Sequence, residues 1–110
     1  MEVDLTDAQL DFAQLSKANL SRSNLRGAKL EKAMLVEADL DTASLENADL
    51  RWVDFSHANL RGAVLMSANL SYANMHRAAL TDAHFVGGRN PYGDGTDEER
   101  AAAEDFTTGA

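Results

Sequence analysis

A large apolar residue occupies every fifth position of this chain, from Leu5 to Phe85. Fourteen of these seventeen residues are Leu, and the other three are Phe55, Met75 and Phe85. A small residue, Ala in fourteen cases, stands two positions earlier, and the position between them is Asp or Asn in nine. The pattern therefore reads A-(D/N)-L-x-x and runs without interruption over residues 3–87.

A period of five fits neither of the regular elements. In an α-helix five residues advance the chain by about 500°, so the leucines would spiral around the helix and form no apolar stripe. In a strand the side-chain period is two, so an odd repeat would place successive leucines on opposite faces. The pattern instead predicts a solenoid that turns once per repeat, with Leu and Ala inside and Asp or Asn bonding nearby backbone amides at the turns.

The phased A-(D/N)-L-x-x repeats resemble the pentapeptide-repeat family, and the resemblance covers 85 of the 110 residues. It implies an all-β solenoid, a right-handed quadrilateral parallel β-helix of about four coils, with four repeats in each coil. Residues twenty positions apart would then stack in columns. We expect the core to contain Leu25, Leu30, Leu35, Leu40, Leu45, Leu50, Phe55, Leu60, Leu65, Leu70 and Met75.

The sequence after the repeats predicts a separate C-terminal element. We divide the chain into a repeat domain over 1–88, a connecting turn over 89–95 and a short α-helix over 96–110. Thr96 and Glu99 form a capping box at the start of that helix. A helix this short needs a docking surface. It is expected either to cover the last coil only, through Phe106 and Tyr92, or also to form a homodimer, as the quinolone-resistance branch of the family does through its C-terminal ends.

Composition narrows the possible partners. The formal net charge is −8, the chain has no Cys, and no apolar run approaches the length of a membrane span. The repeats are already in phase at the first residues, so we expect no signal peptide, no membrane partner and a cytoplasmic protein. An acidic chain disfavours direct binding of nucleic acid. However, residues 3–87 hold 8 Lys/Arg against 11 Asp/Glu, whereas residues 88–110 hold 2 against 6, so half of the net charge lies in the tail.

One outward column of the predicted solenoid contains Phe12, Lys32, Trp52 and Tyr72. Exposed aromatic side chains are typical anchors of protein interfaces, so this column is a candidate partner-binding stripe. The alternative, which we prefer, is that these residues stack on one another for stability, with Lys32 placed for a cation–π contact.

Other outward columns carry charges, in part of alternating sign, and are interpreted as solvated ladders. They are Lys17-Glu37-His57-Arg77, Asp11-Glu31-Arg51 and Arg26-Glu46. His57 and His76 fall on one face in adjacent coils, and two histidines near a carboxylate are a possible metal-binding set. Their spacing matches no ligand motif, so surface histidines are the simpler interpretation.

The sequence contains no motif for catalysis or for a cofactor. The carboxylates Asp39, Asp41, Asp49 and Asp54 fall at turns or on the walls, and no inserted loop would build a pocket around them. We therefore expect no catalytic, cofactor-binding or metal-binding residue, and no enzyme.

Two functions are consistent with the pattern. The first is a non-catalytic scaffold that binds another protein. The second follows from the resemblance: a mimic of duplex DNA that binds a type II topoisomerase such as DNA gyrase and gives quinolone protection. The short solenoid and its mixed wall charges favour the scaffold. A consensus-like engineered solenoid without a native partner is a third alternative.

Overall fold

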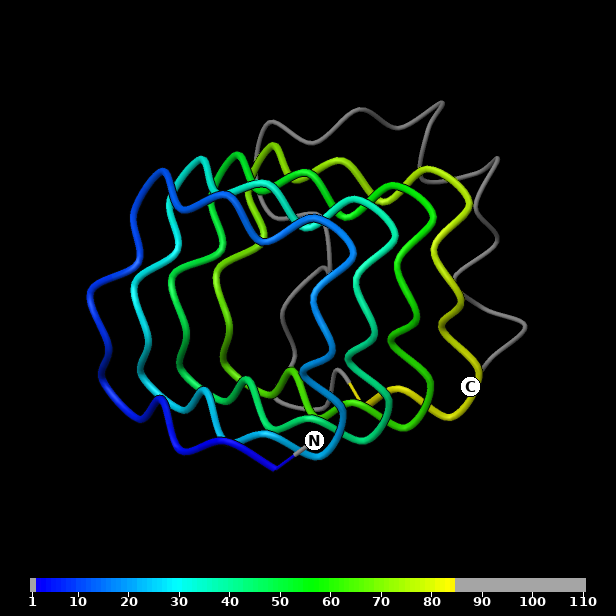
Figure 1. Ribbon diagram of the computed structural model, residues 1–110, viewed down its shortest axis with the longest axis horizontal. Coiled ribbons are helices and arrows are strands. Elements are labelled where there is room, and N and C mark those ends of the chain that lie inside the picture. Colours follow the sequence, from blue (N-terminus) through cyan, green and yellow to red (C-terminus); the bar gives the residue numbers. More distant parts are fainter. Residues whose placement is uncertain (1, 85–110) are drawn as a thin grey trace.

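The computed structural model describes residues 2–84, which form a stack of similar coils lying side by side (Figure 1). Neither a helix nor a continuous strand occurs in these residues; the chain is instead paired through isolated parallel bridges. Every bridge joins residues twenty positions apart, from Asp4 with Asn24 to Val64 with His84. Because the repeat is five residues long, each coil has four walls, and the register expected from the resemblance is present.

Each wall ends in a tight turn at the two variable positions of the repeat. The carbonyl of Leu5 accepts a hydrogen bond from the amide of Ala8 at 3.0 Å, and the same bond recurs along the chain. The second variable residue always has a positive φ, between 57° and 68°, whereas the first does not. This combination is the signature of a type II β-turn. With a turn in every repeat, only one residue per wall pairs as a bridge, so the predicted β-helix has no longer strands.

The Asp or Asn of the repeat completes the hydrogen bonding of these turns. The backbone amides of the Leu and of the second variable residue donate to carbonyls of the next coil, as the Leu5 amide does to the Asn24 carbonyl at 2.7 Å. The backbone amide of the Asp or Asn residue donates to a carbonyl of the preceding coil. The backbone amide of the first variable residue has no backbone carbonyl as its acceptor within residues 2–84. This amide donates to the Asp or Asn side chain two positions earlier, as in Ser56 to Asp54 at 2.9 Å. All nine Asp and Asn residues at this position accept such a bond. The expected role at the turns is thus observed, and it satisfies a donor that would otherwise lack a protein partner.

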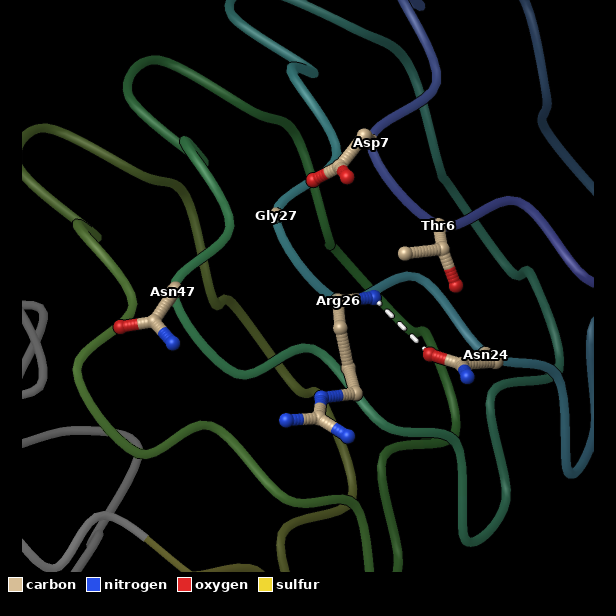
Figure 2. Close-up of a pocket in the computed structure, with 6 residues that line it drawn as sticks. All are labelled: Thr6, Asp7, Asn24, Arg26, Gly27 and Asn47. Atoms are coloured by element: carbon tan, nitrogen blue, oxygen red, sulfur yellow. Dashed lines mark hydrogen bonds between the residues drawn. The ribbon is translucent and has the colours of Figure 1, made fainter.

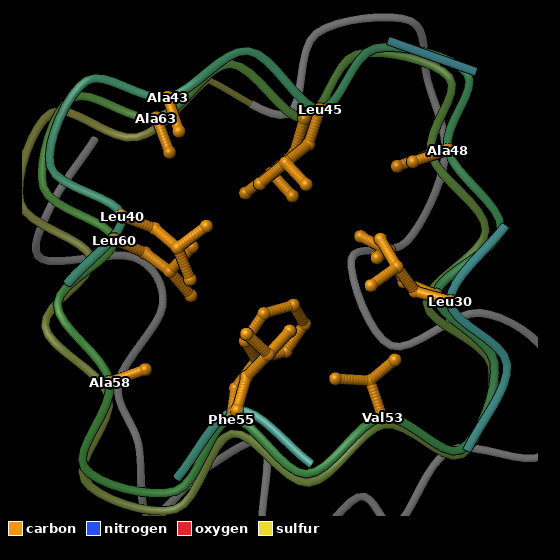
Figure 3. Packing of buried hydrophobic residues seen from close by; sticks show 14 of the residues in the cluster. Leu30, Leu40, Ala43, Leu45, Ala48, Val53, Phe55, Ala58, Leu60 and Ala63 are labelled. Atoms are coloured by element: carbon orange, nitrogen blue, oxygen red, sulfur yellow. The ribbon is translucent and has the colours of Figure 1, made fainter. Parts of the chain in front are cut away.

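Apolar side chains from all four walls point into the interior of the coils, as Figure 3 shows for the middle of the stack. All of the residues expected in the core are buried, with exposed fractions of 2% or less. Between them lie the small residues of the repeats, among which Val53 and Ser23 replace Ala and are also buried. Leu5, Leu10 and Leu15 in the first coil are only partly buried against this core. Packing is therefore tightest in the middle coils.

Several expectations concern residues outside the described range. These are the connecting turn over 89–95, the helix over 96–110, and the contacts of Tyr92, Thr96, Glu99 and Phe106. The right-handed sense of the coil also stays a prediction. Within residues 2–84, no helix has the length and apolar character needed to cross a membrane.

Candidate functional site

The column of Phe12, Lys32, Trp52 and Tyr72 lies along one corner of the solenoid, and we call it the aromatic column. Each of its residues is the second variable residue of a turn, with φ between 62° and 66°. Their side chains point out from the corner: Phe12 is 63% exposed, Trp52 51% and Tyr72 44%. These three are the exposed large hydrophobic residues of the part of the chain that the structure describes. The apolar outer surface is therefore concentrated at one corner.

Neighbouring members of the aromatic column contact each other in pairs. The rings of Trp52 and Tyr72 stack with centroids 4.4 Å apart and an angle of 7° between their planes. The ammonium nitrogen of Lys32 lies 5.8 Å from the centroid of Phe12, within the range of a cation–π contact. The contacts expected for stacking are thus present, while all three aromatic side chains stay exposed. Binding of a partner by this column stays a prediction.

A charged network lies on the wall beside the aromatic column. Arg51 donates two hydrogen bonds to Asp49, from Nε to Oδ1 at 2.8 Å and from Nη2 to Oδ2 at 2.7 Å. Its Nη2 also reaches Glu31 in the preceding coil at 3.3 Å. The hydrogen bonds from Arg51 lower the pKa of Asp49, and the same contacts raise the pKa of Arg51. Sequence reasoning found the Glu31–Arg51 neighbours but missed Asp49. The pair could have been found from the repeat itself, because its second and fourth residues, here Asp49 and Arg51, both point outward.

Two of the ion pairs expected in the other charged columns are present. Lys17 pairs with Glu37 at 3.8 Å, and Arg26 pairs with Glu46 at 3.6 Å. Most of these side chains are more than half exposed, so each pair contributes only a few tenths of a kcal/mol. The ladders therefore make the walls polar without adding much to stability.

The corner on the other side of the Arg51 wall is notched. Its column contains Asp7, Gly27, Asn47 and Ser67, and a shallow opening of about 300 Å³ lies there, lined by Thr6, Asp7, Asn24, Arg26, Gly27 and Asn47. Figure 2 shows Asp7 and Asn47 on either side of Gly27, with Arg26 below. Sequence reasoning treated neither Gly27 nor this opening as a feature, although glycine at the second variable position was the visible signal.

The two histidines that the sequence places on one face, His57 and His76, lie next to each other. The rings of His57 and His76 meet edge to face, with centroids 5.7 Å apart and an angle of 86° between the planes. The amide of His57 donates to the carbonyl of His76 at 2.8 Å. Residues 2–84 contain no group of three or more His, Cys, Asp or Glu side chains placed to hold a metal ion.

Three of the four carboxylates named from the sequence, Asp39, Asp49 and Asp54, accept hydrogen bonds from backbone amides. Asp39 accepts from the amide of Asp41 at 3.1 Å, and Asp54 accepts from both the amide and the hydroxyl of Ser56. A carboxylate held in this way is a turn acceptor on an open wall. Nothing in this arrangement pairs two acids around a shared substrate position.

Comparison with known proteins agrees with the architecture. The family model for pentapeptide repeats matches residues 4–41 and 48–87 in eight copies. No curated protein matches the chain. Among solved structures, a pentapeptide repeat protein from the thylakoid lumen of Arabidopsis thaliana is 32% identical, with a TM-score of 0.54. The match covers 74% of this chain and 60% of that one.

A second solved structure is the pentapeptide repeat protein Rfr23 from the cyanobacterium Cyanothece 51142. It is 33% identical with a TM-score of 0.58, and the match covers 76% of this chain and 54% of that one. The chain thus spans between half and two thirds of the length of these two structures. The matched repeats, the bridges twenty residues apart and the buried Leu columns together show that this chain belongs to the pentapeptide-repeat family.

Proposed function

We propose that this protein is a non-catalytic scaffold that binds another protein through the aromatic column. One observation carries the proposal: the exposed large hydrophobic side chains of residues 2–84 all lie at this corner. Such residues on a soluble surface are typical of interfaces when they are grouped rather than scattered. Aromatic side chains also contribute a large contact area for few rotatable bonds.

The stacking of Trp52 on Tyr72 supports this role rather than competing with it. A ring already held by its neighbour loses little conformational freedom when a partner binds, so less of the interaction energy is spent on ordering. The corner is convex, because both adjoining walls turn away from it. The partner is therefore expected to offer an apolar groove with a polar rim that meets Arg51 and its acidic neighbours.

Site-specific photo-cross-linking tests this proposal. A photoreactive phenylalanine analogue is placed at position 72 in the aromatic column and, as a matched control, at position 47 in the notched corner. Both positions have the same turn conformation, with φ of 63° and 61°. We expect a discrete protein adduct from position 72 in the producing cell and none from position 47. Equal labelling from both positions, or none from position 72, contradicts the proposal.

A mimic of duplex DNA is the second candidate, and the net charge of −8 favours it. A strongly acidic rod competes for a basic DNA-binding groove through long-range attraction. The walls weaken this candidate, because basic residues such as Arg51 and Arg26 are interleaved with the acids. Titration into a DNA gyrase supercoiling assay, with and without a fluoroquinolone and at two salt concentrations, separates the candidates. Inhibition or drug protection that weakens with salt supports the mimic, and no effect leaves the scaffold.

We also propose a division of the chain into segments and a cellular compartment. We assign residues 1–88 to a right-handed quadrilateral β-helix, 89–95 to a turn and 96–110 to a helix that covers the last coil or joins two copies. We place the protein in the cytoplasm. Deleting residues 96–110 should lower the melting temperature or change the molecular mass in solution. An unchanged melting curve together with an unchanged mass would rule out the covering helix.

A further inference from the structure

We infer that His57 and His76 form a binding site for a divalent transition-metal ion on the wall of the solenoid. This site is separate from the aromatic column and does not depend on the proposed scaffold function. The inference rests on the contact between the two rings, on the backbone bond beneath them and on the chemistry of imidazole.

The backbone holds the two histidines next to each other. His57 is the second variable residue of a turn, and His76 is the first variable residue of the turn that stacks on it in the next coil. The His57 amide donates to the His76 carbonyl at 2.8 Å, within a run of equivalent bonds that spans all described coils. The two side chains therefore start from a fixed spacing that folding alone provides.

The separation of the rings suits a shared ion. Two imidazoles that each bind one ion at about 2.0–2.1 Å have ring centres roughly 4.5–6.3 Å apart, depending on the angle at the ion. The observed centroids are 5.7 Å apart, and the planes are nearly perpendicular. Both side chains are exposed, so their side-chain torsions can change on binding to turn a nitrogen of each ring toward a common ion.

The neighbouring groups leave the histidines as the two protein ligands. Asp54 is on the same wall, but its Oδ1 already accepts from the amide and hydroxyl of Ser56 at 2.9 and 2.6 Å. Glu37, one coil below His57 in its corner column, pairs with Lys17 at 3.8 Å. Arg77 follows His76 and opposes a cation. Residues 2–84 provide no third ligand in place, so water completes the coordination.

This ligand set selects the kind of ion. Neutral imidazole suits Cu²⁺, Ni²⁺ and Zn²⁺, whereas Mg²⁺ and Ca²⁺ prefer oxygen ligands. Among the divalent ions, Cu²⁺ should bind most tightly, following the usual order of stability. Because the ligands lie in successive coils, a bound ion would join those coils. An ion that binds only the folded chain also raises the melting temperature.

The experiment titrates CuCl₂, ZnCl₂ and MgCl₂ separately into the full chain by calorimetry, in a buffer that does not chelate metals. Three variants accompany the wild type. His57→Asn removes one ligand and keeps a residue that tolerates positive φ. His76→Gln removes the other, and His84→Asn is the matched control, since His84 is an exposed histidine on a different wall. Melting curves without metal establish that each variant is folded.

We expect saturable binding of one Cu²⁺ and weaker binding of Zn²⁺ to the wild type and to His84→Asn, together with a rise in melting temperature. His57→Asn and His76→Gln should each lose both the binding and the rise, while Mg²⁺ should have no effect on any variant. The inference is overturned if the wild type shows no saturable binding. It is also overturned if His57→Asn or His76→Gln binds as the wild type does, or if His84→Asn loses binding to the same extent.

Discussion

Two corners of the same coil, at Asn47 and Trp52, have one backbone conformation and opposite surfaces. The φ angles are 61° and 63°, and a single wall containing buried Leu50 joins the corners. At Asn47 the column is polar and notched by Gly27, whereas at Trp52 it is built of exposed and stacked rings. The repeat therefore dictates the backbone at both corners, and the second variable position alone decides what each corner presents to solvent.

Turn energetics do not explain the aromatic corner. Gly, Asn and Asp adopt positive φ readily, and they occupy three of the four positions of the notched column. A bulky residue in this conformation costs roughly 1–2 kcal/mol. The stack of Trp52 on Tyr72 returns about 0.5–1.5 kcal/mol, which at best offsets the cost at one of its two residues. The same positive φ occurs at Lys17, Arg22 and Glu37 in other columns, so this cost falls on any residue at the position and does not by itself select an aromatic side chain.

The largest effect is expected from a substitution in the buried core behind the wall that joins both corners. Leu50→Ala leaves a cavity behind the wall between them and should lower the free energy of unfolding by about 2–5 kcal/mol. Denaturant unfolding followed by Trp52 fluorescence and by circular dichroism measures the loss. If the two corners depend on one core, both probes should report the same transition. A loss below about 1 kcal/mol would contradict the central role of this column.

The next effect concerns the notched corner alone. Gly27→Ala should cost about 1–2 kcal/mol because Ala disfavours positive φ. Asp7 is exposed, so its carboxylate can rotate away from an added Cβ at Gly27, whereas at Gly62 a Cβ would meet the side chain of Thr42 at 3.0 Å. Thermal and chemical unfolding should therefore show similar losses for Gly27→Ala and Gly62→Ala. An Asp7→Ala background should leave the loss at Gly27 unchanged, and a smaller loss in that background would assign part of the cost to the overlap with Asp7.

The aromatic corner should show a smaller, paired effect. A double-mutant cycle of Trp52→Ala and Tyr72→Ala should give a coupling energy of about 0.5–1.5 kcal/mol from the lost stack. Far-UV circular dichroism of both single variants should match the wild type, since neither ring is buried. If Trp52→Ala is unfolded, the aromatic column is needed for the fold. The corners at Asn47 and Trp52 would then no longer differ only in the surface that they present.

The smallest effect concerns the wall between the corners. Asp49→Asn keeps the turn acceptor for the Arg51 amide but loses the charged pair, which for a solvent-exposed bridge is worth about 0.2–1 kcal/mol. Arg51 lowers the pKa of Asp49 in the folded state. The stabilisation is therefore complete above the unfolded value of about 3.9 and declines as the pH falls below it. Urea unfolding at pH 7 and pH 3 checks this, and a gap between variant and wild type that widens at pH 3 would be the wrong sign.

Much of the fold followed from the sequence because the register is fixed. Once residues twenty apart were assigned to one column, the burial of Leu45 above Leu25 needed only arithmetic. The same arithmetic placed Lys17 by Glu37 and Lys32 by Phe12, since side chains in stacked coils have few neighbours to choose between.

Features set by torsion angles were not predictable in the same way. The positive φ at Trp52 contradicts its local preference and is imposed by the turn of the repeat. Arg51 reaches Asp49 on its own wall as well as Glu31, a choice that depends on the rotamer of a long side chain. The sequence placed His57 and His76 on one face, but the contact between their rings depends on the conformation of both turns.

The most direct test compares the two corners as binding surfaces. Trp52→Ala and Asn47→Ala alter the same turn position in one coil, and thermal unfolding of each variant establishes that it is folded. Immobilised wild type and both variants are incubated with lysate of the producing cell, and the captured proteins are quantified by mass spectrometry. The account predicts that the protein cross-linked from position 72 is captured by wild type and by Asn47→Ala, and is lost with Trp52→Ala. Retention of that protein by a folded Trp52→Ala variant would contradict the assignment of the aromatic column as the interaction surface.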